Sequence, residues 1–413
     1  MRADSSGSGL FDPARHESLE AHPWDEARAR ATIEWIVRSA EDAFVPQTYW
    51  PMHPLDRGGE AAQPAYPLYF GACGVIWALH YLDAVGAVAL RRRYGGYLAS
   101  LAPRTRSWLE ASGSRDFASY LMGETAIVLL RDGLGPGPDT DTATRLQALI
   151  AGNFGNPARE LMWGSPGTAL AALFMHERTG DERWAQLYRT GVHRLWSELA
   201  WSNECNCHCW MQDMYGHHTR YLGGVHGFAA TASVVIRGRA LLEAAEWSAW
   251  DARIAETIER SALVDGGGAN WPPEALARGS VPRKMLLQFC HGAPGVIACV
   301  ADLPNGALDR LLIAGGETIW NAGPLAKGSN LCHGTGGNGY AFLKLFRRTG
   351  DERWLERART FAMHGIRQTE ADAARYGQLR HSLWTGDPGF AVYLWDCIHG
   401  QARFPTLDVF FAG

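Results

Sequence analysis

Two short turns in the sequence carry the residue types of a metal site. Cys290-His-Gly and Cys332-His-Gly each place a thiol and then an imidazole directly before a glycine. Two thiolates and one imidazole are typical protein ligands of a catalytic zinc site, which leaves its fourth position to water or substrate. The sequence therefore predicts a zinc ion held by Cys290, Cys332 and one histidine, with both His291 and His333 available. The alternative, a pair of ordinary buried cysteines, is disfavoured because the turn occurs twice.

A third histidine and a carboxylate stand at related positions. His226 precedes Gly227 as the other two histidines precede their glycines, but its turn contains no cysteine; Glu160 stands four residues before Gly164. Because its turn brings no thiol, His226 is a poor candidate for the third zinc ligand and a good candidate for a free acid or base. If the turns meet in space, His226 and Glu160 are expected beside the metal ligands.

These turns belong to an internal repeat. Arg178-Thr-Gly-Asp-Glu-Arg-Trp184 recurs as Arg348-Thr-Gly-Asp-Glu-Arg-Trp354, at the same distance from Gly164 and Gly334. Self-similarity at a fixed offset is the signature of a repeat architecture. A glycine followed by small and apolar residues occurs seven times, with the first glycine at positions 71, 123, 164, 227, 292, 334 and 386.

Each repeat has the pattern of two helices joined by a turn. Residues 168–178 favour a helix, Gly180 is suited to end it, and Asp181 is suited to begin the next. No comparable stretch alternates with the period of a strand. We expect an all-α protein in which about seven helical hairpins close into an α/α toroid with inner and outer helix rings, in preference to an open solenoid. Parallel inner helices would gather the glycine turns at one end, where helix N-termini favour anions and thiolates.

Composition limits the class of protein. With 413 residues, a net charge of −4 and a pI near 6.4, the chain lacks the positive charge of a nucleic-acid-binding protein. It has no apolar run long enough for an integral membrane segment and no export signal at its N-terminus, so a cytoplasmic protein is expected. Residues 1–21 predict a mobile N-terminal tail, and residues 22–413 a single α/α toroid catalytic domain.

The other cysteines receive different assignments. Cys205, Cys207 and Cys209 alternate with other residues, which is poor spacing for a tetrahedral zinc site, and they are expected to form an exposed or incidental cluster. The remaining cysteines are expected in the core: Cys73, Cys299 and Cys397.

The chain resembles the lanthionine synthetase C-like (LanC-like) family. The resemblance covers nearly the whole chain after the N-terminal tail, and its strongest segments are 221–227, 331–342, 382–389 and Phe289-Cys-His-Gly-Ala-Pro-Gly295, in which Phe289 replaces the tryptophan usual in the family. It implies zinc ligands at Cys290, Cys332 and His333, which resolves the choice between the two histidines.

The resemblance also implies roles for residues that do not bind the metal. His226 falls on the acid/base histidine of the family. Glu160 stands where bacterial peptide cyclases have aspartate and glutathione-adding relatives have glutamate, and it is expected to orient His226 or to take the thiol proton. Basic residues bind glutathione in that branch: Lys327 matches a family lysine, and Arg375, with Arg380 as the alternative, is the candidate for a family arginine.

The activity that the resemblance implies is zinc-dependent addition of a thiol, glutathione in the first instance, to dehydroalanine or dehydrobutyrine residues of a peptide or protein. The product is a thioether. Two alternatives remain: a lanthipeptide cyclase that uses a thiol of the dehydrated precursor peptide itself, and a zinc-bearing binding scaffold without catalysis. A carbohydrate-active toroid is disfavoured, because it would need paired carboxylates at the rim, where cysteines and histidines dominate.

Overall fold

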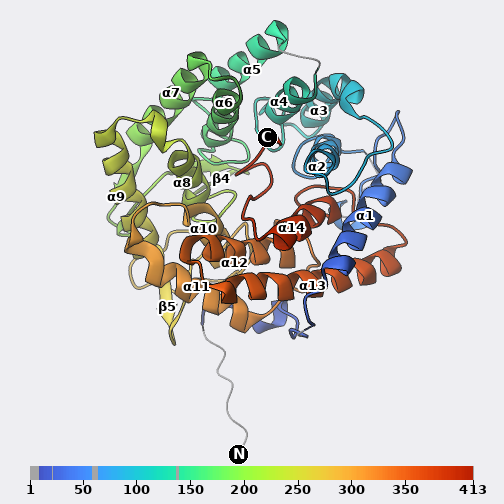
Figure 1. The fold of residues 1–413 in the computed structure, drawn as a ribbon. Coiled ribbons are helices and arrows are strands. Elements are labelled where there is room, and N and C mark those ends of the chain that lie inside the picture. The colour runs from blue at the N-terminus through green and yellow to red at the C-terminus, as the bar shows by residue number, and fades with distance from the viewer. Residues whose placement is uncertain (1–8, 21, 58–63, 136–138, 413) are drawn as a thin grey trace, which may run out of the picture.

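Two concentric rings of helices make up the molecule (Figure 1). The computed structural model describes residues 9–20, 22–57, 64–135 and 139–412. Along the chain, outer and inner helices alternate. The outer helices are α1 (Glu26–Ala43), α3 (Leu101–Ala111), α5 (Thr140–Gly152), α7 (Glu182–Glu198), α9 (Ala244–Ser261), α11 (Asp309–Ala322) and α13 (Glu352–Tyr376). The inner helices are α2 (Ala72–Ala84), α4 (Thr125–Leu134), α6 (Ser165–Thr179), α8 (Phe228–Arg237), α10 (Ala293–Val300), α12 (Thr335–Thr349) and α14 (Asp387–His399). The expected α/α toroid is confirmed.

Burial explains which helices form which ring. In the inner helix α6 every residue from Ser165 to Met175 is buried, so small and apolar residues occupy all of its sides. The outer helix α7 buries a single stripe that includes Trp184, Tyr188 and Leu195, and its other side is charged. The ring closes where α14 packs against α2 and α1.

The predicted turn between the helices of a repeat is also confirmed. Gly180 has φ 67°, in the left-handed region where a helix commonly ends. The Asp181 carboxylate then accepts a hydrogen bond from the Arg183 amide at 2.9 Å and begins α7. Gly350 and Asp351 repeat this arrangement between α12 and α13.

Backbone hydrogen bonds tie successive glycine turns together at one end of the inner ring, which we call the turn end. In five of the seven turns, from Cys290 around the ring to Leu121, the amide two residues before the turn glycine donates to the carbonyl at the equivalent position of the next turn. The N···O distances are 3.1 Å from Cys290 to Cys332, 2.9 Å from Cys332 to Trp384, 2.9 Å from Trp384 to Tyr69, 3.0 Å from Tyr69 to Leu121 and 3.2 Å from Leu121 to Met162. Equivalent positions of different repeats are therefore neighbours in space.

In the described part of the chain, three short β-hairpins interrupt the helices, which the sequence pattern did not indicate. The paired strands are β1 (Ala200–Ser202) with β2 (Cys207–Cys209), β3 (Gln212–Met214) with β4 (His217–Thr219), and β5 (Leu263–Asp265) with β6 (Gly268–Asn270). Strands of three residues are too short to reveal a period of two. The first two hairpins lie in the segment between α7 and α8.

The N-terminal segment differs from the mobile tail expected over residues 1–21. Residues 1–8 and 21 lie outside the described residues. In the described part, Leu10 is buried, His16 forms a β-bridge with Leu325, and the Glu17 amide donates to the Pro324 carbonyl at 2.8 Å. Residues 9–20 therefore form an arm packed against the toroid. Within the described part of the chain, no helix has the length and apolar character needed to cross a membrane.

The close contact of inner helices with the turns yields a stability prediction. A Cβ at Gly337 would lie 1.9 Å from the Leu331 carbonyl oxygen, in the turn that precedes the same helix. Gly337→Ala is expected to lower the free energy of unfolding by about 1–3 kcal/mol, the usual cost of overpacking. Gly152→Ala is the control, because nothing lies within 4 Å of its Cβ position, and it should be neutral or up to about 1 kcal/mol stabilising. Urea denaturation of both variants checks this; equal stabilities would contradict it.

Candidate functional site

Cys290 and Cys332 meet at the turn end. The Cys290 amide donates to the Cys332 carbonyl, and the Cys332 thiol donates to the Cys290 sulfur. Both side chains are buried. Each sulfur also accepts a hydrogen bond from outside the pair, at 2.8 Å from the Tyr69 hydroxyl to Cys332 Sγ and at 2.8 Å from Gln288 Nε2 to Cys290 Sγ. Donors on both sulfurs stabilise negative charge there.

The surroundings separate the pKa values of the two thiols. The hydrogen bond from Cys332 lowers the pKa of Cys290 despite its burial, and Gln288, His226 and Lys327 act in the same direction. The same hydrogen bond, together with burial, raises the pKa of Cys332. Without a metal, the pair is therefore expected to lose its first proton from Cys290.

The donor chemistry at this pair fits a thiophilic metal, although a complete ligand set is not assembled. Among the described residues, no three His, Cys, Asp or Glu side chains are close enough together to hold a metal ion. His333 follows Cys332 in the same turn, and burial lowers its pKa to about 4, so its imidazole is neutral near pH 7. The two thiols, with hydrogen-bond donors directed at their sulfurs, are the part of the predicted metal site that the structure brings together.

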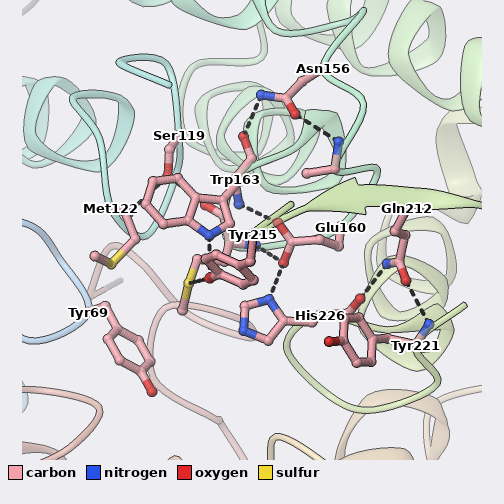
Figure 2. A network of polar contacts seen from close by, with 12 residues as sticks. Tyr69, Ser119, Met122, Asn156, Glu160, Trp163, Gln212, Tyr215, Tyr221 and His226 are labelled. Carbon is pink, nitrogen blue, oxygen red and sulfur yellow. Dashed lines mark hydrogen bonds and ion pairs between the residues drawn. The ribbon is translucent and has the colours of Figure 1, made fainter. Parts of the chain in front are cut away.

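Glu160 and His226 form a second pair (Figure 2), near enough to the thiols for His226 to lower the pKa of Cys290. His226 Nδ1 lies 2.8 Å from Glu160 Oε2, and the Glu160 side chain is fully buried. The carboxylate also accepts hydrogen bonds from the Met162 amide at 2.9 Å and the Trp163 amide at 2.5 Å. The two amides hold Glu160 in one orientation, and Glu160 in turn fixes the ring of His226.

This pair occupies a break in the series of hydrogen bonds between turns. If the series continued beyond Met162, the Met162 amide would donate to Val225, two residues before Gly227. It donates to the Glu160 carboxylate instead, and Glu160 contacts His226, the neighbour of Val225. A buried carboxylate thus spans the gap between the third and fourth turns and orients an imidazole toward the turn end.

Several neighbours of His226 were not identified from the sequence. Gln212 holds the histidine turn in place, because its amide nitrogen donates to the His226 carbonyl and its amide oxygen accepts from the Tyr221 amide. The rings of Tyr221 and Tyr215 lie 6.1 and 5.8 Å from that of His226, and the ring of His291 lies at 6.5 Å. Gln212 and Tyr215 lie on the unpredicted hairpin β3–β4.

Tyr69, in contrast, could have been found from the sequence. It stands two residues before Gly71, the register position that Cys290 and Cys332 occupy before their own glycines. The contact of its hydroxyl with Cys332 follows from that register.

The predicted cationic residues line one cavity next to the thiol pair. Lys327, His333, Arg375 and Arg380 all border a cavity of about 500 Å³. Arg380 pairs with Asp56, with Nε 2.8 Å from Oδ2. Lys327 and Arg375 have no ion pair among the residues the structure describes. Of the two candidate arginines, Arg375 is therefore the one whose charge remains available to a ligand.

The other cysteine cluster is buried, so the expectation of exposure was wrong. Strand β2 directs Cys207 and Cys209 to one face, where both are buried, and Cys205 is buried in the preceding turn. Helix α9 covers this strand, with the Thr257 hydroxyl donating to the His208 carbonyl at 3.1 Å. The prediction of core positions is confirmed for the other cysteines: Cys73, Cys299 and Cys397.

Comparison with known proteins identifies a family that matches most of the chain and relatives that match part of it. Residues 61–409 match the family described as Lanthionine synthetase C-like protein. Glutathione S-transferase LANCL1 of Danio rerio is 35% identical over 139 residues, which is 31% of this chain and 32% of that protein. LanC-like protein GCL1 of Arabidopsis thaliana is 32% identical over 137 residues, 31% of each chain. The matched stretch thus spans about a third of either relative.

A solved structure has the same fold. That of nisin cyclase superposes with a TM-score of 0.59 at 14% identity, covering 89% of this chain and 93% of that one.

The different pKa values of the thiols predict selective alkylation in protein treated with a chelator. Iodoacetamide should modify Cys290 faster than Cys332 near neutral pH, because the thiolate is the reactive form. The Cys290 rate should level off below the ordinary thiol pKa of about 8.5. Peptide mass mapping over time measures both rates. Cys73, whose pKa burial raises, serves as an unreactive control, and equal rates at Cys290 and Cys332 would contradict the assignment.

Proposed function

The chain belongs to the lanthionine synthetase C-like family, and on that basis we propose that it is a zinc-dependent enzyme that adds a thiol to dehydroamino acid residues. The proposed thiol donor is glutathione, and the acceptor is a dehydroalanine or dehydrobutyrine residue of a peptide or protein. The proposal rests on one observation. The thiol pair, the Glu160–His226 pair and the cation-lined cavity all lie at one end of the toroid.

We assign Cys290, Cys332 and His333 as the zinc ligands. Support comes from the adjacent buried thiols, from the hydrogen bonds of Tyr69 and Gln288 to their sulfurs, and from the neutral imidazole of His333 in the same turn. Zinc bound there would supply an open position for the incoming sulfur and would lower the pKa of that thiol.

His226 is the proposed acid/base group. Its Nδ1 faces Glu160, and its Nε2 has no hydrogen-bond partner among the described residues. In the reaction, Nε2 takes the proton of the incoming thiol and Glu160 stabilises the resulting imidazolium. The sulfur then forms a bond to the β-carbon, the π electrons of the C=C bond move to the carbonyl as an enolate, and Nε2 returns the proton to the α-carbon. The net change is addition of S–H across the double bond.

The cavity beside the thiol pair supports glutathione as the donor. Glutathione carries two carboxylates, and the cavity offers the ammonium group of Lys327 and the guanidinium group of Arg375. Glutathione as the donor is also supported by Glu160, because the glutathione-adding relatives have a glutamate at this position. In a cyclase, by contrast, the thiol belongs to the peptide that carries the acceptor, so no separate anionic thiol has to be bound.

Two substitutions separate the proposed ligand role from the acid/base role. Cys332→Ala should lose both bound zinc and activity. His226→Asn should keep zinc and glutathione binding and lose about 10²- to 10⁴-fold in the rate of addition, the usual scale for removing a general acid or base. Metal analysis, melting temperature and single-turnover rates on a dehydroalanine peptide are measured on one preparation of each. A folded, zinc-replete His226→Asn variant with the wild-type rate would exclude the acid/base role.

Glutathione binding is expected to depend on the cavity cations. Calorimetric titration of Lys327→Ala should show binding weakened several-fold, and added salt should weaken wild-type binding, because a partly exposed ion pair is screened. Lys284→Ala is the matched control, since Lys284 lies outside this cavity. Wild-type protein that does not bind glutathione at millimolar concentration would favour the cyclase alternative.

A further inference from the structure

The β3–β4 hairpin presents a tyrosine to the proposed active site from a strained turn. Its two turn residues, Tyr215 and Gly216, have φ 55° and 74°. This left-handed backbone suits glycine but is unfavourable for a residue with a Cβ, and such residues are concentrated at functional sites. The hairpin is anchored at its base, where the Asp213 amide donates to the Pro157 carbonyl at 3.0 Å and Gln212 holds the His226 turn.

The Tyr215 side chain is fixed by the residues that orient Glu160. The Tyr215 hydroxyl oxygen accepts a hydrogen bond from Trp163 Nε1 at 2.7 Å, and the Trp163 amide donates to Glu160. The Tyr215 ring meets the His226 ring edge-on, at 86°. Figure 2 shows the indole of Trp163 and the phenol of Tyr215 beside the Glu160–His226 pair. One network therefore positions both the phenol and the imidazole.

The hydroxyl proton of Tyr215 has only a weak partner. The hydroxyl oxygen accepts from Trp163, and its proton is donated to the Met162 sulfur at an O···S distance of 3.8 Å, a weak hydrogen bond that a substrate oxygen can replace. Packing of the hydroxyl end raises the pKa of Tyr215 to about 12, so the group stays a neutral donor at working pH. The residue as a whole is 60% exposed. Tyr69 cannot serve in the same way, because its hydroxyl donates to Cys332.

We propose that the Tyr215 hydroxyl donates a hydrogen bond to the carbonyl oxygen of the dehydroamino acid residue. The proposal rests on the proposed function and extends it by naming the group that binds the electrophile. When sulfur adds to the β-carbon, the electron pair of the double bond moves toward that carbonyl oxygen. A positioned O–H donor stabilises the developing enolate, while His226 supplies the proton to the α-carbon. No proton leaves Tyr215, so the balance of the addition is unchanged.

The test replaces Tyr215 by phenylalanine, which keeps the ring and removes the donor. Initial rates of glutathione addition to a dehydroalanine peptide give kcat and KM for both substrates, and zinc content, glutathione affinity and melting temperature are measured on the same samples. Tyr215→Phe should lower kcat about 10- to 100-fold, with smaller changes in KM and none in the other three properties. Tyr97→Phe is the matched control, because Tyr97 packs against Phe44, away from the site.

The outcomes separate this inference from the proposed function. Wild-type addition with an equally fast Tyr215→Phe variant would overturn the role of Tyr215 and leave the proposed function standing. A slow variant that has also lost glutathione affinity or thermal stability would assign Tyr215 a structural role instead. Wild-type protein that adds no glutathione to the peptide would overturn both.

Discussion

A repeated backbone hydrogen bond is the constraint on which the site depends. Over most of the ring, from Cys290 to Met162, the amide two residues before one turn glycine donates to the equivalent carbonyl of the next turn, and these bonds lock neighbouring repeats at the same register. Residues far apart in sequence become adjacent when they share that register. Cys290 and Cys332 are neighbours for this reason, and the hydroxyl of Tyr69 reaches the Cys332 sulfur for the same reason.

The break in this series has chemical consequences. Where the Met162 amide lacks a carbonyl partner in the next turn, the Glu160 carboxylate accepts its hydrogen bond. A carboxylate differs from a carbonyl in carrying charge and in having further lone pairs, and Glu160 uses these to hold His226. The Met162 amide thus finds its hydrogen-bond partner in a group that can support acid/base chemistry. This group lies near two thiols whose sulfurs accept hydrogen bonds.

Repetition made much of the fold predictable. The paired glycine turns, the caps at Gly180 and Asp181 and the apolar stripe of α7 are local signals, and they were sufficient for the toroid and for the neighbourhood of Cys290 and Cys332. The repeat predicted only that Glu160 and His226 lie near each other, because sequence does not show where a series of backbone hydrogen bonds stops; that Glu160 orients His226 was expected from the family resemblance.

Features outside the repeat could not be predicted from the sequence. The β3–β4 hairpin has strands of three residues, so neither the hairpin nor Tyr215 at its tip left a periodic signal. Burial of the cluster from Cys205 to Cys209 depends on coverage by α9, a contact between distant segments. The N-terminal arm is polar in composition, and its packing is set by backbone contacts with Pro324 and Leu325 that composition does not reveal.

We propose that this end of the toroid binds a metal through two cysteines and leaves a position open for a substrate thiol. X-ray absorption at the zinc edge of the purified protein can show this. The expected zinc shell has two sulfur ligands, one imidazole nitrogen and an oxygen or nitrogen in the fourth position, and it gains a third sulfur when glutathione is added. Protein that retains no zinc, or a zinc shell whose sulfur count does not change with glutathione, would contradict it.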